Sequence, residues 1–164
     1  KPEDLEKAGE NRPMSSFEEV LINEVIPKID NKFRTIPNRE NRAIAGLSMG
    51  ASQTMSIIMN NLEHFSYYGG FSGTANFPGN KKLDADTFLN GAFSNAEDVE
   101  EKLNMIFLSL GTKEAEIFFK TVNAFRDMLE KQDIDYTFYS SPDTAHEWLT
   151  WRRSLYQYAQ LLFN

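Results

Sequence analysis

Residues 46–50, Gly-Leu-Ser-Met-Gly, constrain the fold of this chain more than any other stretch. They fit the Gly-x-Ser-x-Gly nucleophile elbow, in which a serine lies on a strained turn between a strand and a helix. The short apolar run at 42–45 precedes the motif, and apolar side chains at helical spacing follow it in 51–61. The flanks therefore predict a strand, the elbow and a helix, in this order. The elbow also requires small residues two places either side of Ser48, because neighbouring backbone lies too close there for a Cβ atom.

Composition excludes several classes of protein. The chain has 164 residues, enough for one domain with a real core, and a formal net charge of -7, which argues against a nucleic-acid partner. No apolar stretch approaches the ~18 residues of a membrane span, so no membrane partner is predicted. The sequence also shows no pattern typical of a signal peptide. The absence of cysteine rules out disulfides and a thiol nucleophile. We expect no metal and no cofactor, because His64 and His146 are too far apart for a compact metal motif.

Strands that alternate with helices predict an α/β fold with a mostly parallel sheet and helices on both faces. The predicted strands are 42–45, 65–71, 105–110 and 135–139. The predicted helices are 16–33 (bent at Pro27), 51–61, 96–103 (capped by Ser94), 114–131 and 148–163, after a loop or tail at 1–13. Ligands bind at the carboxyl ends of such strands, so we expect Ser48, the turn at 111–112 and the loop at 142–146 to converge.

A serine hydroxyl needs a base to remove its proton, and histidine, with an ordinary pKa near 6.5, is the usual base at neutral pH. His64 falls between the elbow helix and the next strand, at the opposite end of the sheet. His146 follows the last strand and is therefore the predicted base. We expect activity to fall below about pH 6, because a protonated imidazole cannot accept the serine proton.

A carboxylate must orient the imidazole, and three are candidates. Glu114 follows the strand at 105–110 and is the best placed; Glu116 lies two residues further on, and Asp143 is close to His146 in sequence. The order serine, acid, histidine is the one expected for α/β-hydrolases. The backbone N–H of Met49, directly after Ser48, is the predicted oxyanion donor, and a second donor is expected from an earlier strand that the sequence does not show.

The chain contains, in this order, the segments 45–50 (Ala-Gly-Leu-Ser-Met-Gly), 69–73 (Gly-Gly-Phe-Ser-Gly), 111–114 (Gly-Thr-Lys-Glu), 145–148 (Ala-His-Glu-Trp) and 151–153 (Trp-Arg-Arg). Together these segments resemble carbohydrate esterase family one. That family holds feruloyl esterases and acetyl xylan esterases, and its relatives include enterochelin-esterase-like proteins and mycolyltransferases. The similarity runs from about residue 15 to the end of the chain.

The resemblance implies Ser48 as nucleophile, His146 as base and Glu114 as acid. Members of the family more often carry aspartate where Glu114 stands, which keeps Glu116 as an alternative. They also commonly have two glycines before the histidine, where this chain has Thr144 and Ala145.

The resemblance also implies that residues 1–164 are the C-terminal part of a single α/β-hydrolase domain whose N-terminal strands are missing. The strand at 42–45 would then be an exposed apolar edge. We expect the missing half as a separate piece or as an oligomer partner that completes the sheet. Resemblance alone favours a secreted or periplasmic location.

The implied function is a serine esterase that hydrolyses feruloyl or acetyl esters of plant xylan through an acyl-enzyme on Ser48. Aromatic side chains near the site are candidates to hold a feruloyl ring; Phe71 and Trp148 are the predicted substrate-binding residues, with Phe77 and Trp151 as further candidates. Three alternatives remain open at this stage: a non-catalytic carbohydrate- or protein-binding module, an inactive fragment of the same fold, and an esterase for another small ester such as a siderophore.

Overall fold

The computed structural model describes residues 16–75 and 83–163. By its internal contacts the chain divides into two compact units, Lys1–Pro37 and Asn38–Asn164, each described by itself. The predicted tail at 1–13 and the aromatic side chain of Phe77 lie outside the described residues.

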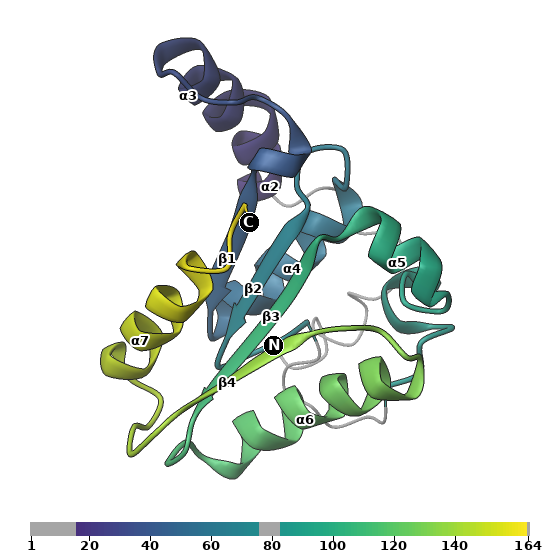
Figure 1. The fold of residues 1–164 in the computed structure, drawn as a ribbon, viewed down its shortest axis with the longest axis vertical. Coiled ribbons are helices and arrows are strands. Elements are labelled where there is room, and N and C mark those ends of the chain that lie inside the picture. The colour runs from purple at the N-terminus through teal and green to yellow at the C-terminus, as the bar shows by residue number, and fades with distance from the viewer. Residues whose placement is uncertain (1–15, 76–82, 164) are drawn as a thin grey trace. The chain divides into compact units, whose positions relative to one another are not determined.

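The first unit contains a helix that changes its winding before a proline. It runs as α2 (Ser16–Val20), a π-helical stretch η1 (Leu21–Val25) and α3 (Ile26–Lys32), with Pro27 in the first turn of α3 (Figure 1). Proline has no N–H to donate to the preceding turn and its ring crowds that turn. A wider π-helical winding just before Pro27 lets the helix continue past it instead of ending.

The second unit is built on a four-stranded parallel sheet (Figure 1). Its strands are β1 (Ala43–Leu47), β2 (Tyr67–Phe71), β3 (Met105–Gly111) and β4 (Thr137–Ser141), in the order β1-β2-β3-β4. Every predicted strand is confirmed, with ends shifted by one or two residues. Because sheet order equals chain order among these strands, the loops at their carboxyl ends follow one another along a single edge.

Burial explains the composition of the two middle strands. All of β2 and nearly all of β3 are buried, as expected for parallel strands with helices on both faces. Side chains alternate between the two faces: Phe71 and Phe107 pack against Tyr158 of the closing helix, whereas Tyr68 points to the elbow helix.

The α-helices of this unit, within the described residues, are α4 (Met49–Asn60), α5 (Ala96–Lys102), α6 (Glu116–Lys131) and α7 (Trp148–Ala159). Figure 1 shows α7 on one face of the sheet and α4 and α6 on the other. The α/β prediction with helices on both faces is thereby confirmed.

Helix α5 begins at residue 96 as predicted, but with another cap, and α4 begins at residue 49, two places earlier than predicted. Asn95, not Ser94, caps α5, because its side-chain oxygen accepts the Glu97 N–H at 3.0 Å while the Ser94 hydroxyl donates to the Gly91 carbonyl at 2.7 Å. Helix α6 begins at residue 116, two places later than predicted. Glu114 therefore lies on a loop, where its carboxylate can turn toward the sheet edge.

Tyr68 links the elbow helix to the sheet through a buried hydrogen bond. Its side chain is fully buried, and its hydroxyl donates to the carbonyl of Ala51 in the first turn of α4 at 3.1 Å. Burial raises the pKa of Tyr68 above the ordinary range for a phenol, so the hydroxyl keeps its proton and remains a donor.

Replacing Tyr68 with phenylalanine should lower the free energy of unfolding by about 1 kcal/mol, because one buried hydrogen bond is lost without a cavity. Urea unfolding followed by circular dichroism measures the change. Tyr156→Phe, at an exposed ring on α7, is the matched control and should change stability by less than about 0.5 kcal/mol. Equal losses in the two variants would show that the Tyr68 hydroxyl does not anchor α4.

Candidate active site

One polar side chain lies just beyond the carboxyl end of each of the four strands, at the same edge of the sheet. Ser48 follows β1, Ser72 follows β2, Glu114 lies beyond β3 and His146 lies beyond β4. The predicted convergence of Ser48, the turn at 111–112 and the loop at 142–146 is present in the structure.

Three of these side chains form a hydrogen-bonded chain. His146 Nε2 lies 2.8 Å from Ser48 Oγ, and His146 Nδ1 lies 2.9 Å from Glu114 Oε2. A serine, an imidazole and a carboxylate in this order give the geometry in which an imidazole can take the serine proton while the carboxylate holds its other nitrogen.

The backbone at Ser48 has the strained conformation of an elbow. Its φ of 52° and ψ of -122° are rare for any residue with a side chain. The Ser48 N–H donates to the carbonyl of Phe71 at 2.7 Å, and α4 begins at Met49. The serine is thus held between the end of β1 and the start of α4, with its backbone bonded to the neighbouring strand.

The steric requirement on the elbow differs from the sequence prediction. A Cβ atom on Gly46 would lie 2.2 Å from the Gly50 carbonyl oxygen, so position 46 must be small as expected. A Cβ on Gly50 would meet nothing within 4 Å, so the requirement predicted there is wrong. The second crowded position is Gly73, after β2, where a Cβ would lie 2.5 Å from the carbonyl oxygen of Ser48. The elbow turn is therefore crowded by the loop after β2, which is distant from it in the sequence.

The carboxylate of Glu114 is buried and fully supplied with donors. Its side chain has no exposed area, and Oε1 accepts the Gly111 N–H at 2.8 Å and the Ser72 hydroxyl at 2.6 Å. The other oxygen is left for His146. A buried carboxylate is costly unless such donors replace water, and three donors do so here.

Aromatic rings fix the imidazole in place. The ring of Phe118, from α6, stacks on His146 with 3.8 Å between centroids and an interplanar angle of 14°. Trp151, from α7, meets the imidazole edge-on at 5.0 Å. His146 keeps 25% of its side-chain area exposed, so a substrate can approach it.

The competing acids and the second histidine have other surroundings. Glu116 pairs with Lys120 at 2.8 Å, which lowers the pKa of its exposed carboxyl, and Asp143 pairs with Lys113 at 3.0 Å. His64 precedes β2 and so lies at the opposite end of the sheet, near Glu63. Among the described carboxylates, Glu114 is the one that contacts His146.

An apolar pocket of about 620 Å³ borders the site. It is lined by Leu47, Phe71, Trp148, Leu149, Trp151, Arg152 and Leu155. The predicted substrate-binding residues Phe71 and Trp148 both line it, but in different ways: Phe71 is only 4% exposed and packs in the core, whereas Trp148 is 75% exposed. The pocket volume lies within the range of small-molecule sites.

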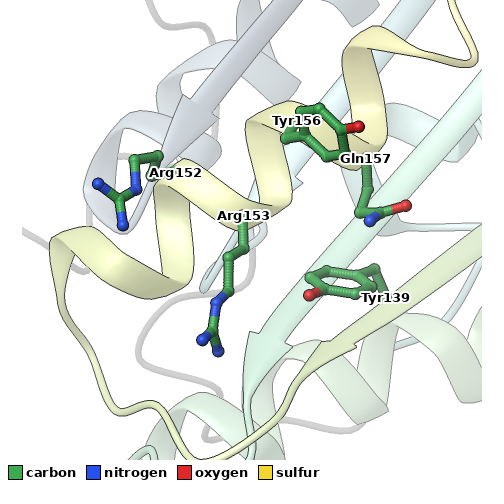
Figure 2. A pocket seen from close by; sticks show the side chains of 5 residues that line it. All are labelled: Tyr139, Arg152, Arg153, Tyr156 and Gln157. Carbon is green, nitrogen blue, oxygen red and sulfur yellow. The ribbon is translucent and has the colours of Figure 1, made fainter.

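A second, smaller pocket lies between β4 and α7. Figure 2 shows its lining side chains, with Tyr139 on the strand and the others on the helix, and its volume is about 380 Å³. The full lining is Tyr139, Arg152, Arg153, Tyr156 and Gln157. These side chains include neither a carboxylate nor an imidazole, so this pocket has no acid–base pair.

Neither a cluster of metal-ligating side chains nor a membrane-spanning helix is found in the part of the chain that the structure describes. Within residues 16–75 and 83–163, no three His, Cys, Asp or Glu side chains are grouped to hold a metal ion. No helix in the same ranges combines the length and the apolar character needed to cross a bilayer.

Sequence reasoning missed Ser72 and Phe118 as neighbours of the candidate site, and it named Trp151 only as a further candidate for holding a substrate ring, not as a contact of His146 and Ser72. Phe118 belongs to the apolar face of a helix, so pattern alone describes it as a core residue. Ser72 has a signal that could have found it, since it is a polar residue directly after an apolar, glycine-rich strand, as Ser48 is.

Comparison with known proteins relates the chain to esterases. The family model described as "Putative esterase" matches residues 3–162. The endo-1,4-beta-xylanase/feruloyl esterase of Xylanibacter ruminicola is 36% identical over 150 residues, which is 90% of this chain and 18% of that protein.

Solved structures share the fold. A CE1 ferulic acid esterase from Anaeromyces mucronatus matches with a TM-score of 0.70 and 20% identity over 90% of this chain and 53% of its own. The enterobactin esterase of Shigella flexneri matches with a TM-score of 0.65 and 19% identity over 96% of this chain and 40% of its own. The chain thus spans about half the length of the solved enzymes or less. Both support the α/β-hydrolase fold.

The glycine contacts predict an unequal tolerance to alanine. Gly46→Ala and Gly73→Ala should each lower stability by about 2 kcal/mol or more, because a methyl group must displace backbone at the elbow. Gly50→Ala should leave stability unchanged or raise it by up to about 1 kcal/mol, because the site is open and alanine favours the helix. Thermal unfolding measures all three, and equal losses at 46, 50 and 73 would contradict the contacts.

Proposed function

This chain belongs to the Esterase family, and from that premise we propose that it is a serine esterase that works through an acyl-enzyme on Ser48. The observation that carries the proposal is the hydrogen-bonded chain from Ser48 Oγ through His146 to Glu114. It joins residues from three separate strand ends. An incidental surface serine would need neither the strained backbone nor an imidazole at 2.8 Å.

In the first half-reaction Ser48 Oγ attacks the ester carbonyl carbon while His146 Nε2 takes the hydroxyl proton. The carbonyl electron pair moves onto oxygen, giving a tetrahedral oxyanion. When this collapses, the bond to the alcohol oxygen breaks and His146 returns the proton to that oxygen. Water then repeats the sequence on the acyl-enzyme and releases the carboxylic acid.

Glu114 and Met49 support the charges that develop in these steps. Glu114 Oε2 accepts the Nδ1–H of His146, which leaves Nε2 free of a proton and stabilises the imidazolium when it forms. The Met49 N–H opens α4, and the first N–H groups of a helix have no partner within it, so this group can donate to the oxyanion.

The substrate that we propose is a feruloyl ester of xylan, with an acetyl ester as the alternative. The relative that is 36% identical carries both xylanase and feruloyl esterase in its name. The apolar pocket offers room and aromatic walls for a phenolic acyl group. Exposed Trp148 is better suited to contact that group than Phe71, because the core packing of Phe71 leaves little of its ring accessible.

Ser48→Ala should abolish labelling by a fluorophosphonate and lower hydrolysis of a feruloyl ester by at least about 10³-fold. Peptide mass spectrometry identifies the labelled residue. Ser94→Ala, an exposed serine on another loop, is the control and should label as the parent chain does. Retained labelling in Ser48→Ala would show that Ser48 is not the nucleophile. Binding of a feruloyl oligosaccharide by the parent chain without hydrolysis would favour a binding module.

Glu114→Gln should lower the labelling rate by about 10²-fold or more, because a neutral amide cannot stabilise the imidazolium. Glu116→Gln and Asp143→Asn are matched controls on the neighbouring carboxylates, and both should stay within about twofold of the parent chain since their partners are lysines. The rate constant for fluorophosphonate labelling compares the three. A large loss in Glu116→Gln would transfer the role to that residue.

A further inference from the structure

We propose that Ser72 is a positioning residue that sets the orientation of Glu114 and, through it, the tautomer of His146. This inference rests on the proposed esterase function, because the role concerns the same hydrogen-bonded chain. Ser72 follows β2, the one strand whose loop the proposed mechanism leaves without a role. Its hydroxyl lies 2.6 Å from Glu114 Oε1, and Trp151 Nε1 lies 2.9 Å from the same hydroxyl.

The direction of these hydrogen bonds follows from the chemistry of the groups. An indole nitrogen can only donate, so Ser72 Oγ accepts from Trp151. A serine hydroxyl has one proton, and the remaining contact is to the carboxylate, so that proton goes to Glu114 Oε1. The relay therefore runs from Trp151 to Ser72 to Glu114.

These hydrogen bonds also set the tautomer of the His146 imidazole. With Oε1 occupied by Ser72 and by the Gly111 N–H, Oε2 is the oxygen that faces His146 Nδ1. An ionised carboxylate accepts only, so Nδ1 carries the proton and Nε2 presents its lone pair to Ser48. Glutamate is one methylene longer than aspartate and so has additional rotamers. The hydrogen bond from the Ser72 hydroxyl to Oε1 limits the rotamers that Glu114 can adopt.

The backbone holds Ser72 in place for this contact. Its φ of 56° is left-handed, a conformation that costs free energy for a residue with a side chain and persists where surrounding contacts impose it. The side chain is fully buried, and the Ser72 N–H donates to the Ser109 carbonyl at 2.8 Å on β3. Trp151 also lines the apolar pocket, so one side chain belongs both to the pocket wall and to the relay.

The test compares Ser72→Ala and Ser72→Gly with a matched buried serine. Glycine removes the hydroxyl and also relieves the left-handed backbone, so it keeps the experiment interpretable if alanine does not fold. Ser109→Ala is the control, because Ser109 Oγ is buried on the adjacent strand and has no hydrogen-bond partner among the described residues. Trp151→Phe removes the indole donor at the other end of the relay.

Both Ser72 variants should lower kcat for a feruloyl ester by about 10- to 100-fold, the range for a hydrogen bond to a charged group, with KM within about twofold. Trp151→Phe should lower kcat less, and Ser109→Ala should change neither constant. A uniform loss in the Ser72 and Ser109 variants, or unchanged kcat in both Ser72 variants, would overturn the proposal.

A second readout does not depend on catalysis. In a Ser48→Ala background, the downfield proton resonance of His146 Nδ1–H should be sharp with Ser72 present and should broaden or vanish in Ser72→Gly. Retention of that resonance in Ser72→Gly would overturn the positioning role. If the parent chain hydrolyses no ester, the proposed function fails, and this resonance still decides whether Ser72 orients Glu114.

Discussion

The buried carboxylate of Glu114 is the constraint on which the arrangement of the site depends. A charge without water requires donors, and the three that it has come from the carboxyl ends of three different strands: Ser72 directly after β2, Gly111 as the last residue of β3, and His146 in the loop after β4. The hydrogen bonds to this one side chain therefore fix the relative positions of these three strand ends. The imidazole is then held from both faces of the sheet, by Phe118 of α6 and Trp151 of α7.

The sheet topology explains why these loops converge. Because the strands run parallel and lie in chain order, each successive loop reaches the same edge, one strand spacing further along. Ser48 and His146 come from the first and last of these strands, and the loops between them supply the orienting groups. Gly73 and Phe71, beside Ser72, also contact the backbone of the elbow, so the loop after β2 touches both ends of the hydrogen-bonded chain.

Much of this could be predicted from the sequence, and particular residues show where prediction ended. The four strands, the elbow and the pairing of Ser48 with His146 follow from hydrophobic patterning and a short motif, because both are local signals. The small-residue rule at Gly50 did not hold, because a Cβ atom there meets open space; the position crowded by the Ser48 carbonyl oxygen is Gly73, which no pattern near the elbow indicates. Ser72 was overlooked since its partners, Glu114 and Trp151, are 42 and 79 residues away.

The sequence by itself determined the class of fold, the order of its elements and the nucleophile and base candidates, since each depends on residues that are neighbours along the chain. Only the tertiary structure decided which carboxylate meets the imidazole. Glu114 lies in the loop after β3, Glu116 begins α6 and Asp143 lies in the loop after β4. Position along the chain favoured Glu114 but left the other two open as alternatives. Burial and partners distinguish the three carboxylates. Glu116 and Asp143 are exposed and pair with lysines. Glu114 is buried, and its donors come from strand ends that are distant from one another in the sequence.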